Sequence, residues 1–200
     1  MKRILTKTVS VILLALMLLP SLFSCSEQRV YYVELNVKDM GRIVLELDAK
    51  AAPKTVAHFV GLVEDGFYDG LTFNRADPSF VLQGGDGGTA SNGISLFGEF
   101  DVNGHMNPIA HRRGVISMAR STGYNSASTQ FFICLTNSES CAALDGQYAA
   151  FGYVAEGMDV VDRIVGKTSG YGDPNNMYFI SDTTKQAVIE SARVLTDYAN

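Results

Sequence analysis

Residues 73–86 read FNRADPSFVLQGGD and place a single arginine, Arg75, among apolar side chains shortly before a pair of glycines. Arginine is mostly a surface residue, so the simplest interpretation is a solvated side chain at the end of a strand. The other interpretation is a cation held at the rim of an apolar pocket. The rest of the chain decides between them.

The glycines of QGGDGG at 83–88 have the composition of a phosphate-binding loop. Such a loop ends in Gly-Lys-Ser or Gly-Lys-Thr and opens a helix. This segment has no such ending. We therefore expect tight turns in a β-rich segment, for which glycine is the usual residue.

The sequence before this stretch predicts a hairpin and a helix. Apolar and polar residues alternate at 31–37 and again at 43–47, which is typical of two half-buried strands joined by a turn. A helix is expected to begin at Pro53, where the missing N–H costs nothing, and to end at Gly66. Ala52 offers no side-chain acceptor to the start of this helix.

The sequence after it predicts short strands and one more helix. Met158, Val161 and Val165 form an apolar stripe at helical spacing, and Gly166 is expected to end that helix. Further strands are expected within 71–100 and at 114–119, 130–135, 149–154 and 187–195, with loops at 101–113 and 167–183. Many short strands with two separated helices predict a mainly β fold, a closed barrel with capping helices.

The N-terminus has the layout of a secretory signal. A basic start at 2–7 precedes an apolar run at 9–19, which is too short to span a bilayer comfortably. LFSC at 22–25 then resembles a bacterial lipobox. That resemblance implies removal of residues 1–24 and attachment of lipid to Cys25. An uncleaved anchor and ordinary cleavage nearby are the alternatives.

The mature chain would begin with a lipidated Cys25 and a short polar tether at 26–29, followed by one domain at 30–200. Two lipid chains on a terminal cysteine anchor a protein firmly, so we expect a membrane-anchored lipoprotein of the bacterial envelope, facing the periplasm. Removal of three basic residues with the signal leaves 13 basic and 21 acidic residues, a net charge of −8. We expect no nucleic-acid partner, because phosphate binding needs a basic face.

Histidines and cysteines offer other chemistries. His105 and His111 lie in one loop without cysteine or carboxylate ligands at suitable spacing, so we expect no metal. Cys134 or Cys141 with His111 as base would make a thiol hydrolase, a distant alternative without a local signature. The two cysteines could also pair in an exported protein, but Cys134 lies in the strand-like run 131–135, which favours a buried free thiol.

An ordered set of short motifs spans most of the chain. The motifs are FNR at 73–75, FVLQGGD at 80–86, GVISMA at 114–119, STQFFI at 128–133, LDGQY at 144–148 and FG at 151–152. In this order they resemble the cyclophilin family of peptidyl-prolyl isomerases, over about residues 30–195. The resemblance implies a closed eight-stranded antiparallel barrel capped by two α-helices, with a groove for proline-containing polypeptides. It implies no cofactor and a monomer.

The same resemblance assigns the site. Arg75, Phe80 and Gln83 would be the catalytic group, with Arg75 donating to the proline nitrogen of a twisted amide and Gln83 binding the substrate backbone. Phe80 would also line the apolar slot for the proline ring. The substrate-binding residues would be Val81, Met118, Ala119, Arg120, Gln130, Phe132, Leu144 and Tyr148.

We therefore expect an envelope-anchored prolyl isomerase that assists the folding of exported proteins. The alternative is a proline-peptide-binding module or chaperone with little turnover, against which the retained Arg75, Phe80, Gln83 and Phe132 argue. Ala143 stands where many family members carry tryptophan or another aromatic residue, so we expect weak inhibition by cyclosporin.

Overall fold

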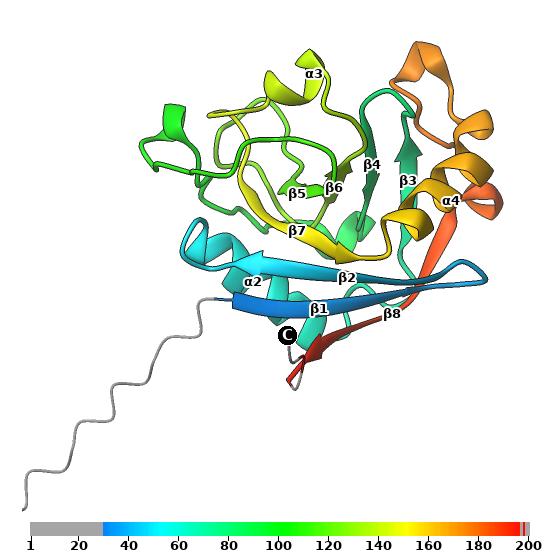
Figure 1. Ribbon diagram of the computed structural model, residues 1–200, viewed down its shortest axis with the longest axis horizontal. Coiled ribbons are helices and arrows are strands. Elements are labelled where there is room, and N and C mark those ends of the chain that lie inside the picture. Colours follow the sequence, from blue (N-terminus) through cyan, green and yellow to red (C-terminus); the bar gives the residue numbers. More distant parts are fainter. Residues whose placement is uncertain (1–29, 197, 199–200) are drawn as a thin grey trace, which may run out of the picture.

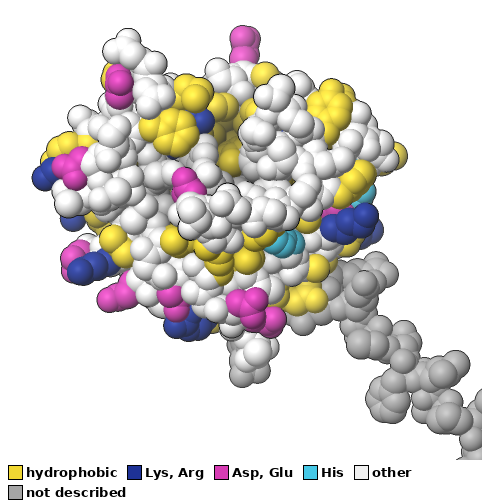
Figure 2. Space-filling view, turned by 180° about the vertical axis from the view of Figure 1, so that it is seen from behind, with side chains coloured by type: hydrophobic (Ala, Val, Ile, Leu, Met, Phe, Trp, Pro, Cys, Tyr) yellow, Lys and Arg dark blue, Asp and Glu magenta, His cyan; other side chains and the backbone are white. Residues whose placement is uncertain are grey.

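The computed structural model describes residues 30–196 and residue 198 (Figure 1). The expected signal segment, the lipidated Cys25 and the tether lie outside the described residues. Within the described part of the chain, no helix combines the length and apolarity needed to cross a membrane. Figure 2 shows the face opposite to that of Figure 1, where acidic and basic side chains of the described residues are interspersed with apolar ones.

Eight antiparallel strands close into a barrel, as predicted. They are β1 (Val30–Val37), β2 (Gly41–Asp48), β3 (Thr72–Ala76), β4 (Val81–Gly84), β5 (Val115–Met118), β6 (Phe131–Cys134), β7 (Ala150–Glu156) and β8 (Ala187–Leu195). Their order around the barrel is β1-β2-β7-β5-β6-β4-β3-β8, and β8 pairs with β1 to close it. Closure leaves the sheet without an unpaired edge.

Two main helices pack their apolar faces into the same core as the barrel. They are α2 (Pro53–Glu64) and α4 (Met158–Thr168), and a short α3 (Glu139–Ala142) lies between β6 and β7. Inside the barrel, the Phe59 ring of α2 lies 5.0 to 5.5 Å from the rings of Tyr68, Phe131 and Phe151. These buried rings fill the interior, so the barrel has a packed core.

The start of α2 is capped from a distance. Ala52 has no side-chain acceptor, as expected, but the carboxylate of Glu99 accepts hydrogen bonds from the backbone N–H groups of Lys54 and Thr55 and from the Thr55 hydroxyl. Glu99 is only 1% exposed. A negative charge at a helix N-terminus is stabilising, so the N–H groups and the dipole of α2 compensate for the burial of the Glu99 carboxylate.

The helix ends test two glycine predictions. Gly66 follows α2 in a left-handed conformation (φ +70°), and its N–H bonds the Val63 carbonyl, which confirms the predicted cap. The prediction for Gly166 was wrong, because α4 continues to Thr168. The Thr168 hydroxyl donates to the Ile164 carbonyl and stays inside the last turn.

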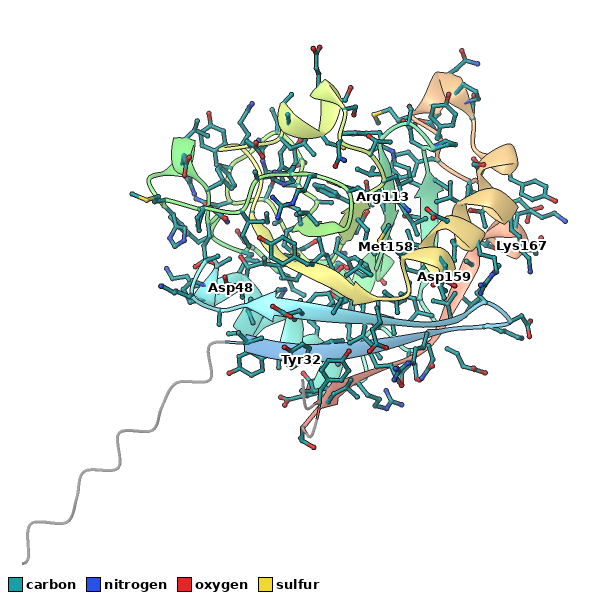
Figure 3. All side chains as sticks on the ribbon, in the orientation of Figure 1. Tyr32, Asp48, Arg113, Met158, Asp159 and Lys167 are labelled. Carbon is teal, nitrogen blue, oxygen red and sulfur yellow. The ribbon has the colours of Figure 1, made fainter. Side chains whose placement is uncertain are left out.

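Arg113 ties the segment before β5 to α4 (Figure 3). One guanidinium nitrogen donates to the Leu135 carbonyl at 2.8 Å, and another donates to both carboxylate oxygens of Asp162 at 2.8 and 2.7 Å. This clamp joins the segment before β5, the end of β6 and α4. It supports the strands that carry the site.

Candidate active site

Strands β4 and β6 place alternate side chains on opposite faces of the barrel wall. Leu82 and Ile133 face inward and belong to the main core. Their neighbours Val81, Phe132 and Cys134 face outward and form a second apolar cluster. Side chains of a strand ordinarily alternate between its two faces, so the outward residues of these two neighbouring strands form one apolar surface on the outside of the barrel.

Arg75 reaches the same outer surface because of a β-bulge. On β3, Phe73 pairs with Gly84 and Arg75 pairs with Gln83, so Asn74 is an extra residue. Phe73 is fully buried in the core, and Arg75 lines the pocket on the outside. Without the bulge, Phe73 and Arg75 would be two apart on a regular strand, and Arg75 would point into the core like Phe73. Bulges that redirect a side chain are common beside active sites.

The glycine pair after Gln83 serves this packing. A Cβ at Gly84 would lie 2.7 Å from the Thr72 carbonyl oxygen, so no larger residue fits between β3 and β4. Gly85 has a φ of +82°, and a Cβ there would meet the Tyr68 and Phe131 rings. These positions need glycine for close approach and for a left-handed turn. The structure thus agrees with tight turns in this segment.

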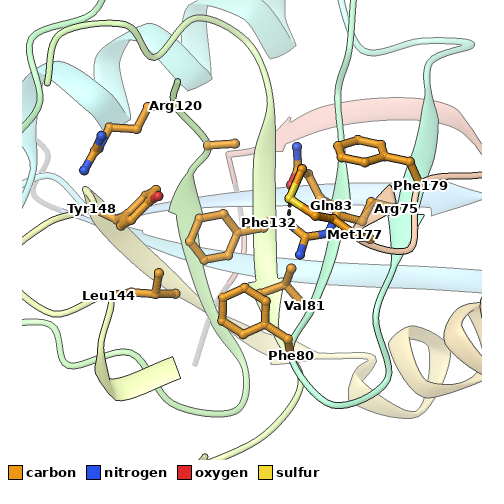
Figure 4. A pocket seen from close by; sticks show the side chains of 11 residues that line it. Arg75, Phe80, Val81, Gln83, Arg120, Phe132, Leu144, Tyr148, Met177 and Phe179 are labelled. Atoms are coloured by element: carbon orange, nitrogen blue, oxygen red, sulfur yellow. Dashed lines mark hydrogen bonds between the residues drawn. The ribbon is translucent and has the colours of Figure 1, made fainter. Parts of the chain in front are cut away.

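A pocket of about 230 Å³ opens on the outer surface of the barrel (Figure 4). Its lining residues come from β3, β4, β6 and the loops on either side: Arg75, Phe80, Val81, Gln83, Ala119, Arg120, Phe132, Leu144, Tyr148, Met177 and Phe179. Phe132 occupies the centre of the view, with Arg75 on one side and Tyr148 on the other. All the predicted catalytic and substrate-binding residues except Met118 and Gln130 line it.

Met118 corrects the sequence-based assignment. Its side chain is 1% exposed and belongs to the main core inside the barrel. Met118 and Ile116 are two apart on β5 and both point inward, so the side chain that faces outward between them is Ser117. Met118 therefore contributes to the core, and the neighbouring Ala119 lines the pocket.

Gln130 belongs to a second, polar pocket of about 300 Å³ that adjoins the first. The two pockets share Gln83, Ala119 and Arg120, so together they form one groove with an apolar and a polar half. The Gln83 side chain joins the halves. Its amide nitrogen donates to Gln130 at 2.8 Å, and its oxygen faces the Arg75 guanidinium at 3.4 Å.

Arg75 is held on two of its nitrogens and flanked by aromatic rings. Its Nε donates to the Met177 carbonyl at 2.7 Å and its Nη1 donates to Gln83. The rings of Phe80 and Phe179 lie 5.5 and 5.8 Å from the guanidinium carbon. Burial lowers the pKa of Arg75, against smaller raising effects of Asp77 and Tyr148, yet an arginine stays charged.

Arg120 and Tyr148 make the opposite wall. The Arg120 guanidinium stacks on the Tyr148 ring at 4.5 Å, and its nitrogens donate to the carbonyls of Gln147 and Ser121. Tyr148 in turn meets the Phe132 ring edge to face at 5.9 Å. Ala143, the position linked to cyclosporin, is exposed at the end of α3 and does not line the pocket, so the expected weak inhibition stays a prediction.

A buried serine and a buried histidine lie behind the pocket floor, and an exposed aspartate holds the histidine. The Nδ1 of His111 is 2.9 Å from Asp145, and its Nε2 is 3.0 Å from the Ser117 hydroxyl. Because a carboxylate only accepts, Nδ1 carries the proton and Nε2 accepts from Ser117. Ser117 has no exposed surface, so no substrate reaches it. His111 stacks on Phe132, and the trio supports that ring from behind.

The other chemistries proposed for histidine and cysteine find no support in this geometry. Cys134 and Cys141 are free and buried, which agrees with the expected thiol state. Burial, together with the neighbouring Cys141, raises the pKa of the Cys134 thiol far above its ordinary value, which opposes formation of a thiolate. His111 is engaged by Asp145 and Ser117, so the thiol hydrolase alternative lacks its base.

Two residues of the pocket were missed by the sequence reasoning. Met177 and Phe179 lie in the loop between α4 and β8, more than 90 residues after Arg75, and no motif marks them. Phe179 pairs with Arg75 in an isolated bridge outside the barrel sheet. The one local signal that could have revealed them is an aromatic residue and a methionine in a loop rich in glycine and asparagine.

Comparisons with known proteins agree with this geometry. The profile of the family described as cyclophilin type peptidyl-prolyl cis-trans isomerase/CLD matches residues 32–194. A peptidyl-prolyl cis-trans isomerase of Schizosaccharomyces pombe is 41% identical over 134 residues, which are 66% of this chain and 83% of that protein. One of Streptomyces antibioticus is 37% identical over 172 residues, 82% of this chain and 98% of that protein.

A solved structure has the same fold. It is a cyclophilin-type peptidyl-prolyl cis-trans isomerase of Cryptosporidium parvum, with a TM-score of 0.68 and 22% identity over 84% of this chain and 99% of that one. A second structure, determined in the presence of the dipeptide Ala-Pro, has a TM-score of 0.65 and 26% identity, and covers 83% of this chain and 99% of that one. The chain belongs to the cyclophilin-type family, and its activity is that of a peptidyl-prolyl cis-trans isomerase.

Proposed function

We propose that the apolar pocket binds the proline of an Xaa-Pro bond and that Arg75 stabilises the twisted amide. Rotation about an amide bond must cross a barrier of about 18–20 kcal/mol, because resonance is lost. In the twisted state the proline nitrogen regains its lone pair and becomes a hydrogen-bond acceptor. A donor aimed at that nitrogen binds the transition state more strongly than the planar ground state, which is the requirement for catalysis.

The environment of Arg75 carries this proposal. Two guanidinium nitrogens are held by Met177 and Gln83, and Nη2 has no hydrogen-bond partner among the described residues. The group lines an apolar pocket in which burial lowers the pKa of Arg75. Donors that are already oriented in a site shielded from water stabilise developing charge without reorganisation.

The remaining residues would bind the peptide. Phe80, Val81, Phe132 and Leu144 offer the apolar surface that a proline ring needs. The polar half of the groove, with Gln83 and Gln130, would hold the backbone beside the proline, and main-chain groups at Arg120 would add to it. The structure of the Cryptosporidium relative in the presence of Ala-Pro supports a proline-containing ligand for this family.

A protease-coupled assay on a short Xaa-Pro peptide tests the mechanism. We expect Arg75→Ala to lower kcat far more than it raises KM, because the proposed hydrogen bond forms mainly in the twisted state. Arg42→Ala is a matched control, since Arg42 pairs with Glu34 and Glu156 on the far strands. Near-normal turnover by a folded Arg75→Ala variant would show that Arg75 is not the catalytic group.

We further propose that the enzyme is anchored to the bacterial envelope through lipid on Cys25 and assists exported proteins there. The basic start, the short apolar run and LFSC at 22–25 support this. Detergent phase partitioning of the full chain is the test. Cys25→Ala should move the protein into the aqueous phase, whereas Cys141→Ala should leave it with the detergent. Equal partitioning of wild type and Cys25→Ala would rule the anchor out.

A further inference from the structure

The loop Gly172–Ile180 docks on β3 beside the proposed catalytic arginine. The N–H of Ile180 donates to the Asn74 carbonyl at 2.9 Å, and the N–H of Ala76 lies 3.4 Å from the Tyr178 carbonyl. Barrel strand β8 pairs with β3 only at Thr72 and Phe73. The loop therefore takes over as the neighbour of β3 where the barrel pairing stops, and Arg75 lies in that part of the strand.

Asp173 holds this loop in one conformation. Its carboxylate accepts from the Asn175 N–H at 2.8 Å, and its carbonyl accepts from the N–H groups of Asn176 and Tyr178 at 2.9 and 2.8 Å. Its own N–H donates to the Phe179 carbonyl at 3.1 Å. One residue thus fixes both ends of the turn between 174 and 179.

The turn contains two consecutive residues in the left-handed region. Met177 has a φ of 50° and Tyr178 a φ of 62°, and among the described non-glycine residues the only other positive φ is at Asp39 in a hairpin turn. Left-handed backbone is unfavourable for residues with a Cβ, and such strain persists only where the surroundings impose it. Here it directs the Met177 carbonyl to the Nε of Arg75, at 2.7 Å.

Met177 lies beside Arg75 in the pocket (Figure 4). We propose that Met177 is a positioning residue, whose carbonyl fixes the rotation of the Arg75 guanidinium so that its free Nη2 faces the proline nitrogen. The proposal rests on the proposed function of Arg75. A guanidinium is planar, so a bond at Nε sets the direction of the other two nitrogens. Gln83 and the flanking rings of Phe80 and Phe179 complete this arrangement.

Substitutions at one position separate the carbonyl from the side chain. Glycine and asparagine readily adopt the left-handed backbone at position 177, so Met177→Gly and Met177→Asn leave the carbonyl in place. Met177→Ile puts a β-branched residue at a positive φ, which shifts the backbone and displaces the carbonyl. We expect kcat to fall about tenfold or more further for Ile than for Gly and Asn, because misplacement of a catalytic group by an ångström is costly, whereas all three variants lose the methionine side chain from the pocket wall. Met106→Ile, at an exposed methionine outside the pocket, is the matched control.

A second pair of variants tests the loop through Asp173. Asp173→Ala removes the acceptor for Asn175 and should lower kcat, and Asp173→Asn, which keeps an acceptor oxygen, should restore it. The proposal is overturned if Met177→Ile, folded by circular dichroism, keeps the wild-type kcat, or if Gly and Ile lower kcat equally. If Arg75→Ala itself keeps its turnover, the proposed function fails first, so the two failures are distinguishable.

Discussion

The two walls around Arg75 are built in different ways. The strand wall consists of Val81, Gln83 and Phe132, which alternate along β4 and β6 with core residues and are held by barrel pairing. The loop wall consists of Met177 and Phe179, which are held by main-chain hydrogen bonds and a left-handed turn. The strand wall is part of the folded core, and the loop wall is attached to it from outside.

Because the walls are built differently, substitutions in them should affect folding stability and catalytic activity to different extents. A side chain of the strand wall contacts buried groups behind it, as Phe132 contacts His111, so its loss affects folding and binding together. The loop wall contributes a carbonyl and a half-buried ring to Arg75 and little to the core. Substitutions in the two walls should therefore give different combinations of stability and activity.

The largest expected effect is at the group that both walls hold. Arg75→Lys keeps the charge, but the three N–H donors of an ammonium radiate from one nitrogen. They cannot reach Met177, Gln83 and the substrate at the positions that the planar guanidinium spans. We expect kcat/KM to fall about 100-fold or more, as for loss of one donor from an oriented site. The protease-coupled assay measures it. Activity within a few fold of wild type would mean that charge alone suffices.

The next prediction compares one phenylalanine from each wall. Phe132→Ala removes a ring that is packed between His111 and Tyr148, and should lower the free energy of unfolding by about 3 kcal/mol. Phe179→Ala should lower it by about 1 kcal/mol or less, because its ring lies at the edge of the pocket. Both should reduce turnover. Urea unfolding of the two variants measures both losses. Equal losses of stability would contradict the proposed difference between the strand wall and the loop wall.

The strand wall could be predicted from sequence and the loop wall could not. The ordered motifs resemble those of the family, and that resemblance assigns Val81, Gln83, Phe132 and most of the pocket. The bulge at Asn74 has no sequence signal, because the pattern from Phe73 to Arg75 is that of an ordinary strand. The Met177 contact is made by a carbonyl, which every residue carries.

Long-range contacts were missed for a similar physical reason. Ala52 suggested a poorly capped helix, and the missing acceptor is supplied by Glu99, 44 residues away from Thr55 in sequence. Gly166 suggested a helix end, but an exposed glycine without a left-handed φ simply continues α4. Local sequence patterns predict local structure. The capping of α2 and the end of α4 also depend on contacts between segments that are distant in the sequence and that the fold brings together.

A smaller effect is expected from pH at the back of the strand wall. Burial lowers the pKa of His111 below its ordinary value of 6.5, and the bond to Asp145 opposes this only in part. The unfolded chain therefore binds a proton that the folded chain resists, so stability is full above about pH 6.5 and is lost as the pH falls toward the lower folded pKa.

The matched variant is His111→Gln, which cannot take up this proton. Urea midpoints at pH 7.5 and 5.5 should differ more for the wild type than for the variant, whatever the variant loses at both values. A wild-type difference no larger than that of His111→Gln would show that His111 does not contribute to the pH dependence.

The smallest expected effect is at the Tyr148 hydroxyl. Tyr148 meets its neighbours through its ring, which stacks under Arg120 and against Phe132. Tyr148→Phe keeps both contacts, so kcat/KM should change by less than about twofold, while Tyr148→Ala removes them and should lower it several-fold. The assay on one peptide compares the three proteins. A large loss in Tyr148→Phe would assign the hydroxyl a part in binding the peptide, and the wall opposite Arg75 would then act through a polar group.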